Sequence, residues 1–290
     1  MIDTKLSPSA HTMSLSKILL HSDGSTSTVS GDVDGAAIPH AQVSGRDILL
    51  RAMLADQEPV EIPLEYLTGC LPVDADVQEG IMRAYDSVLD RHFVVAPSSP
   101  SVDCHTRHPS LQRVYGFSEH YLVLEDFSKG TLADFLKTSK NRVQLNAQRR
   151  ITIMLNVAQV LALQKFAISS STIGMDNNLN PKVMRFAGAD DVHAFGILMV
   201  ELLTGSLQND GSEDRRFGDF SERYTSMGHF IEDDLDPYVR ESWTFNILSQ
   251  LVELALKCIQ VEDRPTPQKL VETLTLISSR MRVVDNYDYY

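Results

Sequence analysis

The chain has 290 residues, of which 43% are hydrophobic and 22% are charged, and these values are ordinary for a globular protein. A chain of this length can bury a sizeable core, so it needs neither disulfides nor a metal to fold. The formal net charge of −13 argues against nucleic acid and anionic membrane as main partners, because both require a basic face. The three cysteines are widely spaced, which favours a reducing compartment. No apolar run approaches the roughly 18 residues of a membrane span. We therefore expect a cytoplasmic protein.

The first third of the chain predicts strands and loops. Residues 15–20 form a short apolar run, and residues 46–54 are mostly apolar and predict a central strand. Over residues 76–92 the apolar positions recur at helical spacing, which predicts a helix with Asp74 or Asp76 as its N-cap.

From residue 120 onward the pattern becomes mainly helical. A predicted strand over residues 121–124 precedes a short helix over residues 131–137. Longer amphipathic or buried helices are predicted over residues 146–165, 192–203, 243–259 and 267–281. Strands first and helices afterwards indicate an α+β protein with two segregated parts.

Five segments, in this order along the chain, resemble the protein kinase fold, and plant receptor-like and Pelle-type kinases most closely. They are His108-Pro109-Ser110-Leu111 with Tyr115-Gly116-Phe117, then YLVLEDFSKGTLADF at 121–135, DNNLNPKV at 176–183, DVHAFGILMVELLTG at 191–205 and LALKCIQVEDRP at 254–265. They resemble the start of the fourth strand, the hinge, the turn between the two strands that flank the nucleotide, the buried central helix and the penultimate helix with its arginine turn. The resemblance implies a bilobal fold: a divergent β-rich N-lobe over residues 1–124, a helical C-lobe over 125–282 and an acidic, tyrosine-containing tail over 283–290.

The residues that perform phosphoryl transfer in this family are replaced. The resemblance places the catalytic loop on residues 165–172, where Ala167 stands in the position of the base and cannot accept a proton. Thr172 stands in the position of the metal-binding asparagine. The Asp-Phe-Gly triplet falls on residues 185–187, so that Arg185 puts a permanent cation where the family has a metal-binding aspartate.

The activation segment is largely deleted. Only residues 188–190 separate the triplet from the buried central helix, so the platform for a peptide substrate is missing. The family's counterpart of Arg264 pairs with a glutamate of that segment. Arg264 must therefore find another partner or face solvent.

A degraded nucleotide cleft is predicted from Gly24, Arg51, Leu124, Glu125 and Phe127. Gly24 belongs either to a degraded glycine-rich loop or to a plain turn between two strands. Arg51 either takes the place of the phosphate-binding lysine or is an exposed arginine at a strand end. Leu124 stands at the gatekeeper position, with the hinge after it. We expect no cofactor, or at most weak ATP binding that does not depend on metal.

A metal site is not expected. Cys104-His105-x-x-His108 superficially suggests zinc, but four ligands are normally required, and His108 is better explained as the family's structural histidine.

The sequence thus predicts a catalytically inactive pseudokinase. We expect it to act as a protein-binding scaffold or allosteric partner in cytosolic signalling. In plants the resemblance implies receptor or immune signalling, with an active kinase or an immune receptor as partner. The alternatives are a nucleotide-binding sensor, or an atypical serine/threonine phosphotransferase that recruits metal through Asp176 or Asp190.

Overall fold

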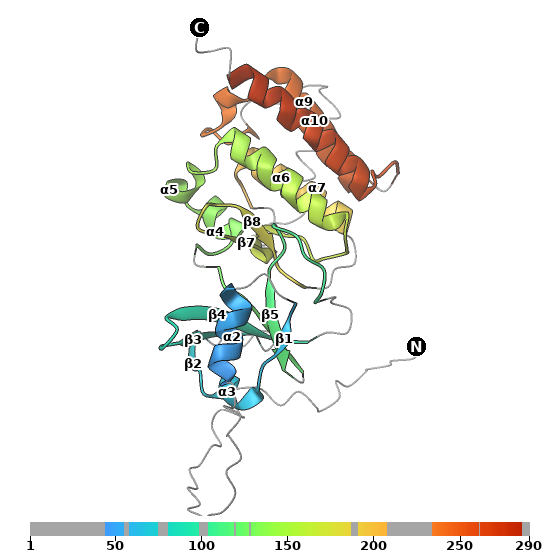
Figure 1. Cartoon of the computed structure of the whole chain (residues 1–290). Coiled ribbons are helices and arrows are strands. Elements are labelled where there is room, and N and C mark those ends of the chain that lie inside the picture. The colour runs from blue at the N-terminus through green and yellow to red at the C-terminus, as the bar shows by residue number, and fades with distance from the viewer. Residues whose placement is uncertain are drawn as a thin grey trace, which may run out of the picture. The chain divides into compact units, whose positions relative to one another are not determined.

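The computed structural model describes residues 44–54, 58–74, 81–98, 104–118, 120–127, 129–186, 191–207, 234–260 and 262–285. The chain divides into two compact units (Figure 1): unit 1 comprises Met1–Pro100 and Arg113–Asp126, and unit 2 comprises Ser101–Gln112 and Phe127–Tyr290. The apolar run over 15–20 and Gly24, in its predicted glycine-rich loop or turn, lie outside the described residues.

Unit 1 is built around a six-stranded sheet in the order β1-β5-β6-β4-β3-β2. The pairs are antiparallel, except that β1 runs parallel to β5. The strands are β1 Val60–Glu61, β2 Leu71–Asp74, β3 Met82–Asp86, β4 Arg91–Pro97, β5 Val114–Ser118 and β6 Tyr121–Glu125. Two helices, α2 Gly45–Leu54 and α3 Leu64–Thr68, contribute Leu49 and Leu67 to a core shared with Phe93, Val95 and Val123 of the sheet.

Two predictions in unit 1 are wrong. Residues 46–54 form helix α2 rather than a strand, with Leu49 and Ala52 buried three positions apart on one face. Within residues 76–92, the described part forms β3, a turn and the start of β4 rather than a helix. The burial of β3 alternates strictly along the strand, which is the period of a sheet and not of a helix.

In unit 2 the predicted helices are confirmed. The elements are α4 Leu132–Lys137, α5 Ser139–Arg142, α6 Ala147–Leu161, η1 Ser170–Thr172, β7 Ile173–Met175, β8 Pro181–Val183, α7 Asp191–Thr204, η3 Arg240–Ser242, α9 Phe245–Ile259 and α10 Pro267–Asp285. Thr131 closes a capping box at the start of α4, and Asn146 accepts the Arg149 N–H at the start of α6. Each cap satisfies backbone donors that would otherwise be unpaired.

Helix α7 lies in the core of unit 2, as the sequence predicts for its buried central helix. Phe195 is fully buried, and Val192, Leu198, Val200 and Leu202 are buried with it, whereas Ile197 is only partly so. The glycine in this helix allows close packing on α9: a Cβ on Gly196 would collide with Cys258 and Ile259.

A buried ion pair ties the loop before α9 to this core. Arg150 of α6 is completely inaccessible and donates to the carbonyls of Leu145 and Leu202 and to the carboxylate of Asp236. Each of the three guanidinium nitrogens of Arg150 thereby has an acceptor, and a buried cation requires such partners.

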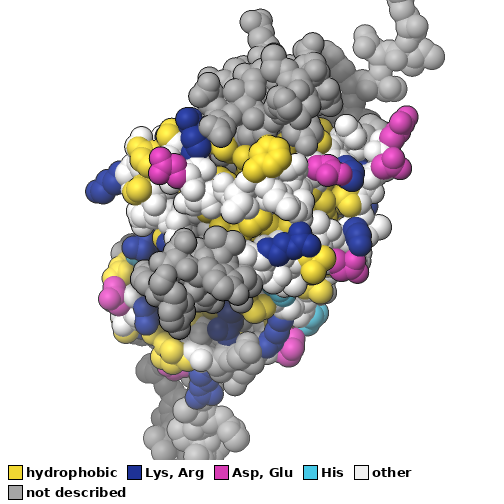
Figure 2. All heavy atoms as spheres, turned by 90° about the horizontal axis from the view of Figure 1, so that it is seen from above, with side chains coloured by type: hydrophobic (Ala, Val, Ile, Leu, Met, Phe, Trp, Pro, Cys, Tyr) yellow, Lys and Arg dark blue, Asp and Glu magenta, His cyan; other side chains and the backbone are white. Residues whose placement is uncertain are grey.

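Arg264 finds other partners, because its guanidinium donates to the carbonyls of Ile259 and Gln260 at the end of α9. None of the helices among the described residues combines the length and apolarity needed to cross a membrane. On the face shown in Figure 2, basic and acidic side chains are interspersed rather than gathered by sign.

Candidate functional site

The segment assigned to the catalytic loop is a tight turn held by its own hydrogen bonds. Ser169 and Thr172 form a capping box around η1. The Thr172 hydroxyl also donates to the Ala167 carbonyl at 2.7 Å. Thr172 thus uses its side chain to close the loop, whereas the side chain of Ala167 is only a methyl group.

Two of the predicted degenerate segments meet in unit 2. The Ala167 N–H donates to the Phe186 carbonyl at 2.8 Å, and the Met184 N–H donates to the Thr172 carbonyl at 2.9 Å. The segments that the resemblance assigns to the catalytic loop and to the triplet are therefore joined by backbone hydrogen bonds.

Arg185 is a buried structural cation. It is 6% exposed, and its guanidinium donates to the carbonyls of Gln112, at 2.8 Å, and Thr106, at 2.5 Å. The Arg185 N–H also donates to the Gln112 side chain. These bonds fasten the triplet segment to the stretch that precedes β5.

Asp176, one of the residues considered for metal recruitment, closes a turn instead. One carboxylate oxygen accepts the N–H groups of Asn178 and Asn180, and the other accepts the Asn180 side-chain amide. Asp190 lies outside the described residues. Within the described ranges, no group of three or more His, Cys, Asp or Glu side chains is arranged to hold a metal.

The predicted nucleotide-cleft residues among the described ranges lie on different elements. Arg51 is exposed in the last turn of α2, so its assignment to a strand is wrong. In protein kinases the phosphate-binding lysine lies on the third strand of the N-terminal sheet. In this chain the third strand of the antiparallel run β2-β3-β4 is β4. Its sequence, RHFVVAP, contains no lysine.

Each residue of the predicted hinge, 124–127, belongs to one of the two units: Leu124, Glu125 and Asp126 to unit 1, and Phe127 to unit 2. Leu124 is buried on β6, and the Glu125 carboxylate accepts the Arg113 N–H. Asp126, which the sequence does not single out, accepts two bonds from Arg83 of β3. Phe127 is 8% exposed and belongs to unit 2.

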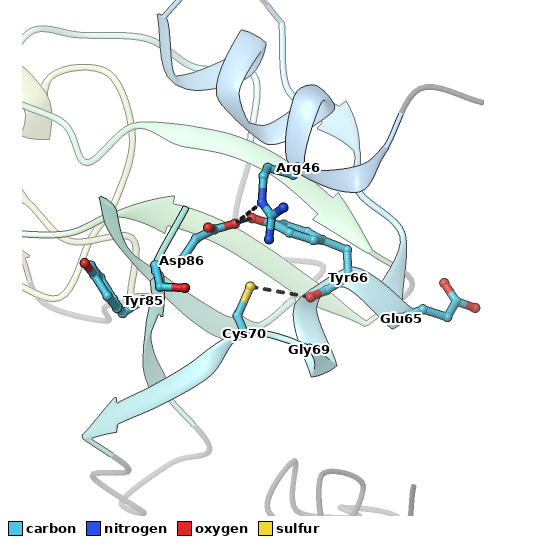
Figure 3. A pocket seen from close by; sticks show the side chains of 8 residues that line it. Arg46, Glu65, Tyr66, Gly69, Cys70, Tyr85 and Asp86 are labelled. Carbon is cyan, nitrogen blue, oxygen red and sulfur yellow. Dashed lines mark hydrogen bonds and ion pairs between the residues drawn. The ribbon is translucent and has the colours of Figure 1, made fainter. Parts of the chain in front are cut away.

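A polar pocket in unit 1 was not predicted (Figure 3). Its volume is about 260 Å³, and its lining includes Arg46, Tyr66, Cys70 and Asp86. Asp86 is buried and accepts the Tyr66 hydroxyl at 2.5 Å and the Arg46 Nε at 3.0 Å.

The protonation states in this pocket follow from burial and hydrogen bonding. Burial alone raises the pKa of Asp86, but bonds from Tyr66, the Leu89 N–H, Arg46 and the Val88 N–H together lower it to about 2. Burial also raises the pKa of Tyr66 and that of the Cys70 thiol. A protonated thiol is a poor nucleophile, so Cys70 is not suited to nucleophilic chemistry. The hydrogen bonds to Asp86 join α2 and α3 to the turn after β3, because they come from Arg46, from Tyr66 and from the N–H groups of Val88 and Leu89.

The comparisons define the class of fold. No family model matches the chain. An apo pseudokinase structure superposes with a TM-score of 0.61 at 17% identity, over 77% of this chain and 98% of that one. The pseudokinase domain of BIR2, described as an immune regulator of the RLK/Pelle family, gives a TM-score of 0.57 at 20% identity, over 69% of this chain and 78% of that one. The chain thus has a protein kinase-like fold, as the resemblance implied.

The relatives in sequence are plant receptor-like and serine/threonine kinases. STRUBBELIG-RECEPTOR FAMILY 5 of Arabidopsis thaliana is 25% identical over 243 residues, which cover 63% of this chain and 35% of that protein. The serine/threonine-protein kinase SZE1 of the same plant is 22% identical over 225 residues, covering 60% of this chain and 70% of that one. The chain therefore spans about a third of the first relative's length.

Proposed function

We propose that this chain is a pseudokinase that signals by binding another protein and transfers no phosphate. The observation that carries the proposal is the state of Arg185, which is buried and donates to the carbonyls of Thr106 and Gln112. A cation held in this way is a structural element, whereas phosphoryl transfer requires a metal-binding carboxylate at this position.

The loop residues support the same proposal. Ala167 has no atom that can take a proton from a substrate hydroxyl, and the Thr172 hydroxyl is engaged within its own turn. A base and two metal ions act together in this chemistry, so the joint loss leaves no residual route through these positions.

The partner we propose is an active kinase or an immune receptor in plant receptor signalling, and the place of action is the cytoplasm. The likeness to plant receptor-like kinases and to an immune regulator's pseudokinase domain supports this choice. The net charge of −13 supports a protein partner rather than nucleic acid.

Reconstitution with purified components tests the binding function. Affinity purification from plant tissue, followed by mass spectrometry, supplies candidate kinases, and the recombinant kinase domain is then mixed with this chain after nucleotide has been removed enzymatically. We expect a stable complex that forms equally well with a catalytically dead partner. A complex that forms only while ATP is being consumed would contradict a scaffold.

The alternative that we retain is a nucleotide sensor or an atypical phosphotransferase. A sensor predicts that ATP at saturating concentration raises the melting temperature of the pure protein. The scaffold hypothesis predicts that ATP leaves the melting temperature unchanged, or raises it slightly and to the same extent with and without Mg²⁺.

A further inference from the structure

One stretch of unit 2 reverses the sign of the chain's charge. Residues 127–169 contain seven lysines and arginines and one acidic residue, Asp134, whereas the whole chain has 26 basic and 39 acidic residues. Asp134 is engaged at the start of its own helix, because its carboxylate accepts the Thr131 N–H and hydroxyl in the capping box of α4. This stretch is therefore positive in a chain that is acidic as a whole.

Four of these cations lie close together along the chain, where α4 is joined through α5 to α6 (Figure 1). Lys137 lies in the last turn of α4, Lys140 and Arg142 lie in α5, and Arg149 lies in the first turn of α6. The backbone between them is folded into turns, one of which is closed by the Leu145 N–H donating to the Arg142 carbonyl at 2.9 Å. We call these four cations the basic surface.

Three of the four cations can meet a further carboxylate. Lys140 is exposed, and within the part of the chain that the structure describes it forms no ion pair. Arg149 donates one bond to the Gln144 carbonyl. Lys137 lies 3.7 Å from the exposed carboxylate of Asp134, and an exposed pair at that distance is weak. Their charges are thus only partly compensated by the chain itself.

Two apolar side chains accompany the basic surface. Val143, directly after α5, is 56% exposed, and Tyr238 is 47% exposed. The Arg142 guanidinium lies 5.5 Å from the centre of the Tyr238 ring and donates to the Gly205 carbonyl, which places Tyr238 beside the cations. Protein interfaces are enriched in aromatic side chains and in arginine. The combination is therefore typical of an interface with another protein.

We propose that the basic surface, together with Val143 and Tyr238, binds a segment of the partner protein that is rich in Asp and Glu. This inference rests on the proposed function, which supplies the partner. Carboxylates complement the cations, and the two apolar side chains offer contact to an apolar residue of the same segment. The charge is assigned to carboxylates rather than phosphates because the scaffold is expected to bind a catalytically dead partner equally well.

The range of electrostatic interactions favours such a segment over an anionic membrane. The Debye length is about 8 Å at physiological ionic strength, so a narrow segment bound at this surface interacts mainly with the nearby cations. A membrane faces a whole side of the molecule, and the net charge of −13 then opposes its binding. A local reversal of charge therefore suits a short peptide segment.

Charge reversal tests the proposal in the whole chain. The test variant reverses three cations of the basic surface: Lys137→Glu, Lys140→Glu and Arg149→Glu. The control variant reverses three exposed cations of α9 and α10: Lys257→Glu, Lys269→Glu and Arg280→Glu. Both variants change the net charge by the same amount, so a difference between them is local. Arg142 is left intact because it also contacts Asp236 and Gly205 within the fold.

The measurement is surface plasmon resonance with the kinase domain that affinity purification supplies. At about 0.1 M salt the test variant should bind at least about tenfold more weakly than wild type, mainly through a slower association rate, and the control should stay within about twofold. At about 1 M salt, where the Debye length is about 3 Å, wild type and the test variant should bind almost equally. A folded test variant that binds as wild type does, or a control that is weakened equally, overturns the proposal and leaves the scaffold standing.

A second probe separates the surface from the partner. Wild type should bind a labelled short polyglutamate peptide in fluorescence anisotropy at about 0.1 M salt, and the test variant should not. No binding of this peptide by wild type overturns the basic surface whatever the kinase domain does, whereas absence of any kinase complex overturns the scaffold. Binding to phosphatidylserine vesicles that the test variant loses, without binding of the peptide, overturns the proposal in favour of a membrane.

A single substitution keeps the test decisive if the triple variant is unstable. Lys140→Glu changes an exposed side chain that forms no ion pair within the described ranges, so its melting temperature should equal that of wild type. We expect it to weaken binding of the kinase domain at least about threefold at about 0.1 M salt. Unchanged binding by this folded variant would contradict the proposal.

Discussion

Replacing Arg185 by alanine is expected to unfold unit 2 more readily without any effect on nucleotide binding. Among the bonds that the substitution removes are the charge-assisted ones from Nε to the Gln112 carbonyl and from Nη2 to the Thr106 carbonyl. Each such bond contributes about 1.5–3 kcal/mol. Because the Gln112 acceptor is then left in a buried position and the Thr106 acceptor in a half-buried one, the loss should be about 3–5 kcal/mol. For a chain of this size that corresponds to a fall of about 10 °C in melting temperature.

The assay is thermal and urea unfolding of wild type, Arg185→Ala and Arg185→Lys. Lysine keeps the charge but cannot reproduce the planar fork, so it should recover less than half of the loss. Arg51→Ala, at an exposed position of α2, is the matched control and should change stability by less than about 0.5 kcal/mol. The reasoning is refuted if Arg185→Ala leaves the melting temperature unchanged and instead weakens ATP binding, because Arg185 would then face a ligand.

Three further predictions concern stability. Phe195→Asp places an unpaired charge at a fully buried position of α7 and should cost more than about 4 kcal/mol; a soluble variant with the wild-type melting temperature would show that this helix is not the core. Asp236→Ala strands the inaccessible Arg150 and should cost about 3–5 kcal/mol in urea unfolding, and a loss below about 1 kcal/mol would argue against the buried pair. Because the pKa of Asp86 is lowered from 3.8 to about 2, its contribution is complete above pH 3.8 and is lost as the pH falls toward 2. Wild type should therefore lose stability over that range more steeply than Asp86→Asn, and equal slopes would contradict the carboxylate's role.

The helices of unit 2 could be predicted because local and global signals agree there. Asn146 and Thr131 are cap residues that stand directly before apolar residues at helical spacing, and both cap in the structure. The buried face of α7 follows from a run of apolar residues too long for a strand. The contacts within a helix join residues that are close in sequence, so the pattern of apolar residues in a single sequence is enough to predict the helix.

Unit 1 was harder, because short apolar runs do not distinguish strands from helices. A local signal did exist: the Ser44 hydroxyl accepts the Asp47 N–H and donates to the Asp47 carboxylate, as a helix start does. In β3 the informative pattern was the alternation of Met82, Ala84 and Asp86 on the buried face.

The assignment of Ala167, Thr172 and Arg185 to the candidate site rests on the spacing of the kinase-like segments, and this spacing does not predict how the three residues are bonded. The Thr106 carbonyl that binds Arg185 is 79 residues away in sequence, and no local pattern connects the two.

The most direct measurement of the central claim is incorporation of labelled γ-phosphate by the pure chain, with Mg²⁺ or Mn²⁺, into itself, into a generic substrate and into the captured partner. The account predicts no incorporation above a protein-free control, and no difference between wild type and Arg185→Ala. Robust incorporation by wild type that disappears in Arg185→Ala would contradict it, because Arg185 would then take part in the transfer that the loss of a base and metal ligands should prevent.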